Sequence, residues 1–257
     1  MKNILQELCE KRRADALVRE SSVPYGEVLR RLEKAAPPRD FAAAFRGDGI
    51  HVIAELKKAS PSEGMIREDF RPAELAEELE GAGAAALSVL CEPHRFLGSE
   101  EYLRTARQVV DLPILYKDFI TTRYQVAEAR AAGADCILLI AAALNDAALV
   151  ALRAHARELG MAALVETHDE HEIRRAVELD CEIIGVNCRD LRNFKTDTSL
   201  IRDLIGTIPQ SCIRIAESGM HTANAVREAR AAGADGFLVG TALMRSPRPG
   251  QKLKELI

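Results

Sequence analysis

The chain carries the stretch EARAAGADCILLIAAAL at residues 128–144 and a close copy, EARAAGADGFLVGTALM, at residues 228–244. Each copy indicates the end of a polar-faced helix, an Ala-Ala-Gly-Ala-Asp turn and a short apolar strand. Gly133 and Gly233 suit a helix C-cap, where a left-handed backbone favours glycine. Looser copies occur at residues 78–90 and 177–187. The chain therefore predicts a repeated helix–turn–strand unit.

Apolar runs rich in Val, Ile and Leu recur along the chain, separated by helical patterns. We expect strands at residues 50–56, 84–90, 112–116, 135–141, 162–166, 182–187, 212–217 and 235–239. Near-continuous apolar strands are typical of a parallel sheet that is covered by helices. Eight strand–helix units in about 200 residues favour a closed (βα)8 TIM barrel of the α/β class over an open doubly wound sheet.

Residues 1–49 precede the first expected strand and indicate helix, interrupted near Pro37 and Pro38. They are too short to form a domain of their own. We interpret them as an N-terminal helical extension that covers one end of the barrel. The expected organisation is a single domain over residues 1–257, with the cover in 1–49 and the barrel in 50–257.

Composition excludes several classes of function. The chain has 35 Lys+Arg against 39 Asp+Glu, a formal net charge of −4, so we expect no nucleic-acid partner. The Lys-Arg-Arg run at residues 11–13 is interpreted as a solvated helix face. The six cysteines contain no Cys-x-x-Cys pair and the N-terminus has no secretory pattern, which favours the cytoplasm. The longest apolar run, residues 136–144, is too short to span a membrane.

Charged side chains gather where the expected strands end, which is where barrels of this kind carry their active sites. The period of two places Glu55 and Lys57 on the face shared by Ile53, and it turns Lys117 inward after Leu115. The other strand ends add Glu166, Asn187, Arg189, Glu217 and Ser218. Each residue alone is consistent with a solvated strand end or half of an ion pair. Together they predict a catalytic rim, because crowded charges shift each other's pKa values.

Two loops predict a phosphate site. Ser218-Gly219 and Gly240-Thr241 each follow an expected strand and precede a helical segment. Glycine lets an anion approach backbone N–H groups, and a helix N-terminus favours negative charge. The loops after strands seven and eight commonly bind phosphate in this fold. We therefore expect a phosphorylated small molecule as the ligand.

Three further features carry less weight. His168 and His171 are possible metal ligands, but no third ligand accompanies them, and HDEH indicates a capped helix start. Cys188 lies between two inward-facing residues and so faces outward, away from the position of a nucleophile. No Gly-x-Gly-x-x-Gly or Walker-type loop is present, so we expect no nucleotide cofactor and no metal.

The motif VIAELKKASPS at residues 52–62 closely resembles the signature of indole-3-glycerol-phosphate synthases. The resemblance continues in order through SVLCE (88–92), FLG (96–98), LYKDF (115–119), LVE (164–166), GVNCRDL (185–191), AESG (216–219) and FLVGTALM (237–244). It implies a cofactor-free carboxy-lyase of tryptophan biosynthesis. That enzyme closes the ring of 1-(2-carboxyphenylamino)-1-deoxyribulose 5-phosphate with loss of CO2 and water. Two departures, Cys91 for Thr and Thr241 for Ser or Glu, remove no charged group.

The resemblance also implies roles. Lys117 matches the general acid that protonates the ketone oxygen, and Lys57 matches a lysine that contacts the substrate's carboxylate and phosphate. Glu55 and Glu166 match carboxylates assigned to proton transfer, with their division of labour left open. The other matches are Asn187 and Arg189 for substrate positioning, Glu217 and Ser218 as polar partners, Ser60, Gly219, Gly240 and Thr241 for phosphate, and Phe96, Leu138 and Leu191 for the aromatic ring.

Two alternatives stay open. A barrel like phosphoribosylanthranilate isomerase is expected to carry a Cys/Asp pair at strands one and seven, where this chain has Glu55, Lys57 and Glu217. A non-catalytic barrel subunit is expected to have lost some of the charged strand ends, which are all present. We expect the protein to be a monomer or a homodimer.

Turnover is expected to be insensitive to chelators, because His168 and His171 lack a third ligand. The measurement is the initial rate with and without EDTA. A loss of activity that one divalent cation restores would return attention to this histidine pair.

Overall fold

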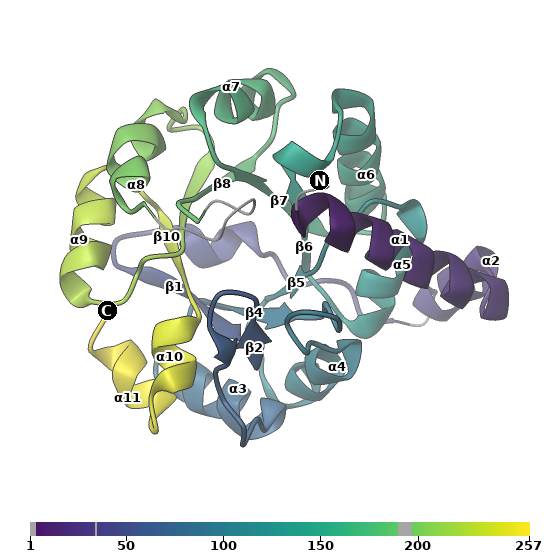
Figure 1. Ribbon diagram of the computed structural model, residues 1–257, viewed down its shortest axis with the longest axis horizontal. Helices are drawn as coiled ribbons and strands as arrows, with labels where there is room; N and C mark the ends of the chain where they lie inside the picture. The colour runs from purple at the N-terminus through teal and green to yellow at the C-terminus, as the bar shows by residue number, and fades with distance from the viewer. Residues whose placement is uncertain (1–3, 34, 190–196) are drawn as a thin grey trace.

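The computed structural model describes residues 4–33, 35–189 and 197–257. Eight parallel strands close into a barrel, and helices surround it (Figure 1). The strands are β1 (His51–Leu56), β4 (Ala86–Leu90), β5 (Ile114–Lys117), β6 (Cys136–Ile140), β7 (Ala162–Thr167), β8 (Ile183–Asn187), β9 (Ile213–Glu217) and β10 (Gly236–Val239). Their order around the barrel is β1-β10-β9-β8-β7-β6-β5-β4, with β4 pairing back to β1. The predicted TIM barrel is confirmed.

Helices follow the strands around the outside of the barrel. They are α3 (Pro72–Gly81), α4 (Glu100–Val109), α5 (Arg123–Ala132), α6 (Asp146–Glu158), α7 (Glu170–Glu178), α8 (Ser199–Leu204), α9 (Ala223–Ala231), α10 (Thr241–Arg245) and α11 (Pro249–Lys254), with 3-10 turns η1 (Ala42–Phe45), η2 (Ala141–Ala143) and η3 (Ile205–Thr207). Thr122, Asn145, Asp169 and Thr222 cap four of these helices by accepting a backbone N–H. Such caps fix where a strand-to-helix loop ends. Within the described residues, no helix is both long and apolar enough to cross a membrane.

The strands separate two cores. Ile53 and Leu115 belong to the cluster inside the barrel, whereas Val52, Ala54 and Leu56 belong to the cluster between the strands and the helices. This alternation confirms the period-of-two interpretation of β1. The same alternation predicts that the charged residues at the C-terminal ends of the strands, two positions after these apolar residues, also point inward.

The glycines of the repeated unit have the left-handed backbone that was expected. Gly133 has φ 98° at the C-cap of α5, and Gly233 has φ 113° just beyond α9. A Cβ atom at Gly133 would lie 3.0 Å from Cγ of Arg107. Glycine therefore lets each helix end turn sharply into the next strand.

The aspartate of the repeated unit ties neighbouring strands together at the base of the barrel. Asp135 accepts the backbone N–H of Ile114 at 2.7 Å and pairs with Arg107 at 2.6 Å. Asp235 likewise accepts the backbone N–H of Arg214 at 2.9 Å and pairs with its guanidinium at 2.9 Å. The repeat thus encodes strand-to-strand contacts at the end opposite the charged rim.

The N-terminal segment reaches both ends of the barrel rather than the one end expected. In α1 (Ile4–Ser22), Leu5 and Leu8 join the interior cluster at the C-terminal ends of the strands. Helix α2 (Tyr25–Leu32) packs on α5 (Figure 1). Beyond it, Arg39 donates its backbone N–H to Asp135, and a Cβ at Gly236 would lie 2.6 Å from Phe45 at the base. The segment covers both ends because it runs past the outside of α5.

The sequence indicated that the Lys-Arg-Arg run at residues 11–13 is a solvated helix face. This is wrong for one of the three residues. Lys11 and Arg13 are exposed, but Arg12 is only 3% exposed and donates to the carboxylate of Asp118 from Nε, at 2.9 Å to Oδ1, and from Nη2, at 2.5 Å to Oδ2. Asp118 directly follows β5. The mixed local charge concealed this contact, because its partner lies 106 residues away.

A small hairpin after β1 was not predicted. Its strands β2 (Ala59–Ser60) and β3 (Gly64–Met65) pair antiparallel. Two-residue strands are too short to show an alternating pattern. The hairpin holds Ser60 at the mouth of the barrel, where it lines the cavity.

Replacing Asp135 by alanine is expected to lower the free energy of unfolding by about 3 kcal/mol, because the change leaves the buried N–H of Ile114 and the half-buried guanidinium of Arg107 without their partner. Asp235→Ala is the matched control. Its side chain is 25% exposed against 3% for Asp135, so we expect a loss of about 1 kcal/mol. Urea unfolding followed by circular dichroism measures both, and equal losses would contradict this account of burial.

Candidate active site

The sequence-predicted site residues converge on one cavity of about 880 Å³ at the C-terminal ends of the barrel strands. Leu191 is the exception, since it lies outside the described residues. The predicted residues that line the cavity are Glu55, Lys57, Ser60, Phe96, Lys117, Leu138, Glu166, Asn187, Arg189, Glu217, Ser218, Gly219, Gly240 and Thr241. The barrel has therefore brought together side chains from strands that are far apart in sequence.

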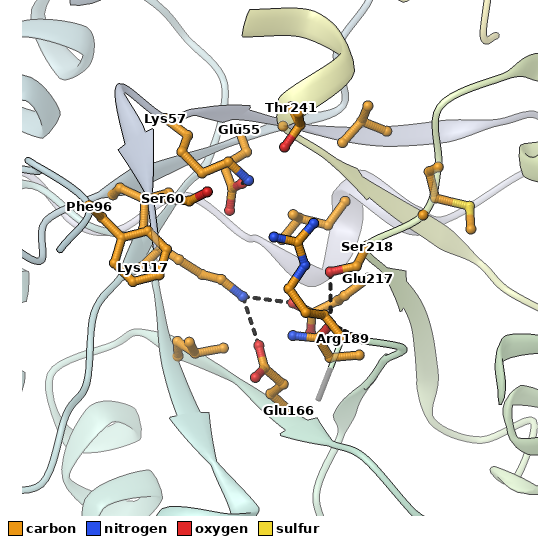
Figure 2. Close-up of a pocket in the computed structure, with 18 of the residues that line it drawn as sticks. Glu55, Lys57, Ser60, Phe96, Lys117, Glu166, Arg189, Glu217, Ser218 and Thr241 are labelled. Atoms are coloured by element: carbon orange, nitrogen blue, oxygen red, sulfur yellow. Dashed lines mark hydrogen bonds and ion pairs between the residues drawn. The ribbon is translucent and has the colours of Figure 1, made fainter. Parts of the chain in front are cut away.

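Lys117 is the centre of the charged cluster. Figure 2 shows its ammonium pointing between Glu166 and Glu217. The distances from Nζ are 2.9 Å to Glu166 Oε2 and 2.7 Å to Glu217 Oε2. Burial acts to lower the pKa of Lys117, but Glu166, Glu217 and Glu55 outweigh it and raise the pKa above its ordinary value. Lys117 is therefore an ammonium at neutral pH.

The two carboxylates that contact Lys117 are not equivalent. Burial and the neighbouring Glu166 raise the pKa of Glu217 above its ordinary value, against the effect of Lys117. Burial acts in the same direction on Glu166, but Lys117 and His168 outweigh it and lower its pKa. Glu166 is therefore the anion, and Glu217 is the carboxyl group that more readily takes up a proton.

Gly185 makes room for Glu217. A Cβ atom at this position on β8 would lie 2.1 Å from Glu217 Oε1. That oxygen is buried and has no hydrogen-bond partner among the described residues. The glycine thus allows the carboxylate to bend across the barrel toward Lys117.

Lys57 pairs with Glu55, with 2.7 Å between Lys57 Nζ and Glu55 Oε2. The two residues are two positions apart along the chain, so their side chains point to the same side of the strand and the ion pair forms locally. A Cβ at Gly240 would lie 2.2 Å from Glu55 Oε2 and 2.9 Å from Lys57 Nζ. The Glu55–Lys57 pair therefore lies directly against the backbone of the loop after β10.

Asn187 organises the opposite side of the mouth. Its Oδ1 accepts the hydroxyl of Ser218 at 2.8 Å and the backbone N–H of Arg189 at 3.0 Å. The backbone of Ser218 and Gly219 is left-handed, with φ 67° and 75°. Arg189 also donates to the hydroxyl of Ser62 in the hairpin loop. These contacts join the loops after β8, β9 and β1 around the cavity.

Cations gather on the side of the cavity that the glycine loops form. Burial lowers the pKa of His221, and the charges of Arg189, Lys57 and Arg245 lower it further. Three positive groups therefore act on the stretch after Gly219, and the carboxylate of Glu63 opposes them. This side is suited to an anionic group of a ligand.

The opposite wall of the cavity is apolar. Phe96 and Leu138 line it as predicted, together with Leu90, Phe119 and Ile140. The rings of Phe96 and Phe119 are 6.2 Å apart and tilted. This wall is suited to a flat aromatic group, next to the Lys117 ammonium.

Sequence reasoning missed the role of three titratable residues around the cavity. Asp118 and His221 line it, and His168 lies behind Glu166. Asp118 and His221 stand beside residues that were identified, in LYKDF and after AESG, but their inward placement depends on loop geometry. His168 was considered only as a metal ligand.

The residues that were set aside have other surroundings. Among the described residues, no group of three or more His, Cys, Asp and Glu is arranged to hold a metal ion. His168 instead contacts two glutamates. Cys188 packs in the cluster between the strands and the helices, and burial raises the pKa of its thiol to about 11. Cys91, a departure from the family motif, belongs to the same cluster.

Comparison with known proteins gives one consistent family. Residues 5–256 match the family model for indole-3-glycerol phosphate synthase. The chain is 46% identical over 260 positions to an indole-3-glycerol phosphate synthase of Acidithiobacillus ferrooxidans, covering 100% of this chain and 99% of that one. It is 50% identical over 230 positions to indole-3-glycerol phosphate synthase 2 of Streptomyces coelicolor, covering 89% of each chain.

Solved structures show the same fold at low identity. The N-acetylmannosamine-6-phosphate 2-epimerase of Clostridium perfringens aligns with a TM-score of 0.63 at 17% identity, covering 85% of this chain and 95% of that one. The orotidine 5'-phosphate decarboxylase of Pyrococcus horikoshii aligns with a TM-score of 0.60 at 14% identity, covering 80% and 96%. At these identities the likeness supports the barrel alone.

Proposed function

The chain belongs to the indole-3-glycerol phosphate synthase family, and we propose that its barrel mouth performs ring closure with Lys117 as the general acid. The family's substrate, 1-(2-carboxyphenylamino)-1-deoxyribulose 5-phosphate, has an aromatic ring, a carboxylate, a ketone and a phosphate. The observation that carries the proposal is the buried Lys117 ammonium, held by Glu166 and Glu217 beside an apolar wall. The two rival functions lack such support, because the relatives belong to this family and the charged strand ends converge.

In the first chemical step the aromatic carbon bonds to the ketone carbon, and the C=O electron pair moves to the ketone oxygen, where negative charge develops. In this proposal Lys117 neutralises that charge and donates its proton, while Phe96 and Leu138 hold the ring. A positioned ammonium stabilises such a transition state more than the ground state. Loss of CO2 then restores aromaticity, and loss of water completes the product.

The phosphate is proposed to bind on the cationic side of the cavity. Lys57 and Ser60 contribute side chains, and the loops at Gly219 and Gly240-Thr241 contribute backbone N–H groups. Glycine at position 240 brings the loop close to the Glu55–Lys57 pair, which leaves no room for a side chain. In this proposal the Lys57 ammonium contacts both the phosphate and the carboxylate of the substrate.

Glu166 is proposed to move a proton during dehydration, with Glu55 as a second carboxylate for proton transfer. Lys117 and His168 lower the pKa of Glu166 and so keep it unprotonated at neutral pH, the form that a base needs, although the same shift makes it a weaker base than Glu217. Asn187, Arg189 and Ser218 position the substrate from the opposite side.

The proposed activity has a direct test. The carboxyphenylamino substrate is added to the pure, folded protein, and the appearance of indole fluorescence is recorded. No increase with folded protein would reject the proposed function.

We also propose a cytoplasmic location, which the six free cysteines support because a reducing compartment keeps thiols unpaired. A monomer or a homodimer is proposed as the working state. Light scattering coupled to size-exclusion chromatography distinguishes these two states.

Replacing Lys117 by alanine is expected to leave the fold intact and to lower kcat by at least about 100-fold, the usual scale for a general acid. Lys58→Ala is the matched control, since this lysine follows Lys57 but does not line the cavity. Steady-state kinetics measures both variants. If kcat were unchanged and KM alone rose, Lys117 would be a binding group and Lys57 the next candidate acid.

The change Glu166→Gln separates proton transfer from electrostatic tuning, because it keeps the size of the side chain and removes its basicity. We expect a strong fall in kcat at every pH. If Glu166 only raised the pKa of Lys117, its loss would lower that pKa, shift the alkaline limb of the pH–rate profile to lower pH and spare the plateau. The full kcat profile against pH decides between the two.

A further inference from the structure

His168 lies directly behind Glu166, outside the set of residues that line the cavity. Its Nε2 is 3.4 Å from Glu166 Oε1, and its Nδ1 is 3.2 Å from Glu172 Oε2. The imidazole is 16% exposed, so it is mostly withdrawn from solvent. The proposed reaction assigns no role to this residue.

The start of α7 holds the imidazole in place. Asp169 caps the helix by accepting the backbone N–H of Glu172 at 2.8 Å. Glu172 Oε2 then accepts the backbone N–H of His168 at 2.9 Å and also contacts the ring. Because Nδ1 is held by Glu172, the other nitrogen, Nε2, is directed to Glu166.

Glu166 is consequently held from two sides. Its Oε2 contacts Lys117 at 2.9 Å and its Oε1 contacts His168 at 3.4 Å. Among the described residues, Lys117 and His168 are the cations that contact Glu166, so without His168 the Lys117 ammonium alone would face both Glu166 and Glu217. The imidazole therefore supplies the charge that lets Glu166 and Glu217 share one lysine.

The protonation state of His168 agrees with this geometry. Burial acts to lower its pKa, but Glu166 and Glu172 outweigh burial and raise the pKa to about 10. His168 is thus an imidazolium at neutral pH, and both of its nitrogens are donors. Its Nε2 makes no well-aligned hydrogen bond within the described residues, so the contact with Glu166 is chiefly between charges.

We propose that His168, held by Glu172, is a positioning residue that fixes the orientation of the Glu166 carboxylate and directs its Oε2 toward Lys117. The inference rests on the proposed function of Glu166 in proton transfer. The histidine does not touch the substrate and acts through Glu166. Residues that orient a functional side chain in this way commonly matter almost as much as the side chain itself.

The first experiment compares His168→Gln with His171→Gln. The control histidine lies in the first turn of α7, three positions after His168, and is exposed. We expect His168→Gln to lower kcat by roughly 10- to 100-fold with KM changed by less than about threefold, and His171→Gln to match the wild type. Because the imidazolium lowers the pKa of Glu166, its loss raises that pKa, and the acidic limb of the kcat profile moves to higher pH. An unchanged kcat and profile would overturn the inference.

A double-mutant cycle tests whether His168 acts through Glu166. In the Glu166→Gln background, His168→Gln is expected to cause little further loss, since the residue it positions has already been disabled. Losses that multiply in full would show an independent effect and would overturn the proposal.

Two measurements keep the outcomes distinct. Thermal melting followed by circular dichroism shows whether each variant is folded. If His168→Gln does not fold, Glu172→Gln provides the second test, with an expected loss in kcat of roughly tenfold, and wild-type behaviour would overturn the proposal. An inactive wild type would reject the proposed function itself, whereas an active wild type with an equally active His168→Gln variant rejects only the positioning role.

Discussion

The ammonium of Lys117 is buried between two carboxylates, and most features of the barrel mouth follow from the need to hold it there. A buried ion is stable only when its partners compensate for the lost hydration. Glu166 and Glu217 supply that compensation at 2.9 and 2.7 Å. Gly185 leaves the space for Glu217 to reach across the barrel. If either carboxylate moved away, the remaining contacts would no longer offset the burial of the lysine.

The residue after this lysine anchors the same site to the N-terminal segment. Asp118 is 2% exposed and binds the guanidinium of Arg12, which is itself buried. Helix α1 is therefore tied to the end of β5, next to Lys117. The apolar residues Leu5 and Leu8 of the same helix pack in the interior cluster. The N-terminal segment is thus part of the support of the mouth, as well as a cover for the base.

The two ends of the barrel divide stability from chemistry. At the base, Asp135 and Asp235 join neighbouring strands through backbone N–H groups and arginines. At the mouth, the same strands end in charged side chains that are only partly compensated, such as Glu217, one of whose oxygens has no hydrogen-bond partner in the described part of the chain. This division is general for the fold, in which one face carries the site and the other carries stability. The contacts at the base stabilise the barrel, so the mouth can contain charged groups that do not add to the stability of the fold.

Local chemistry in the sequence determined the strands, the glycine turns and the residues that end each strand. Strand periodicity and helix caps act over a few residues, so Glu55, Lys117, Glu166 and Glu217 could all be placed at the rim. The pairings among them depended on the closed barrel, which decides which side chains meet across its width. Thus Lys57 pairs with Glu55 rather than Glu166, and Arg12 is buried against Asp118. The position of His168 behind Glu166 likewise depends on the start of α7, where Glu172 orients the imidazole ring. Partners far apart in sequence leave no local pattern, because their contact is made by the tertiary structure alone.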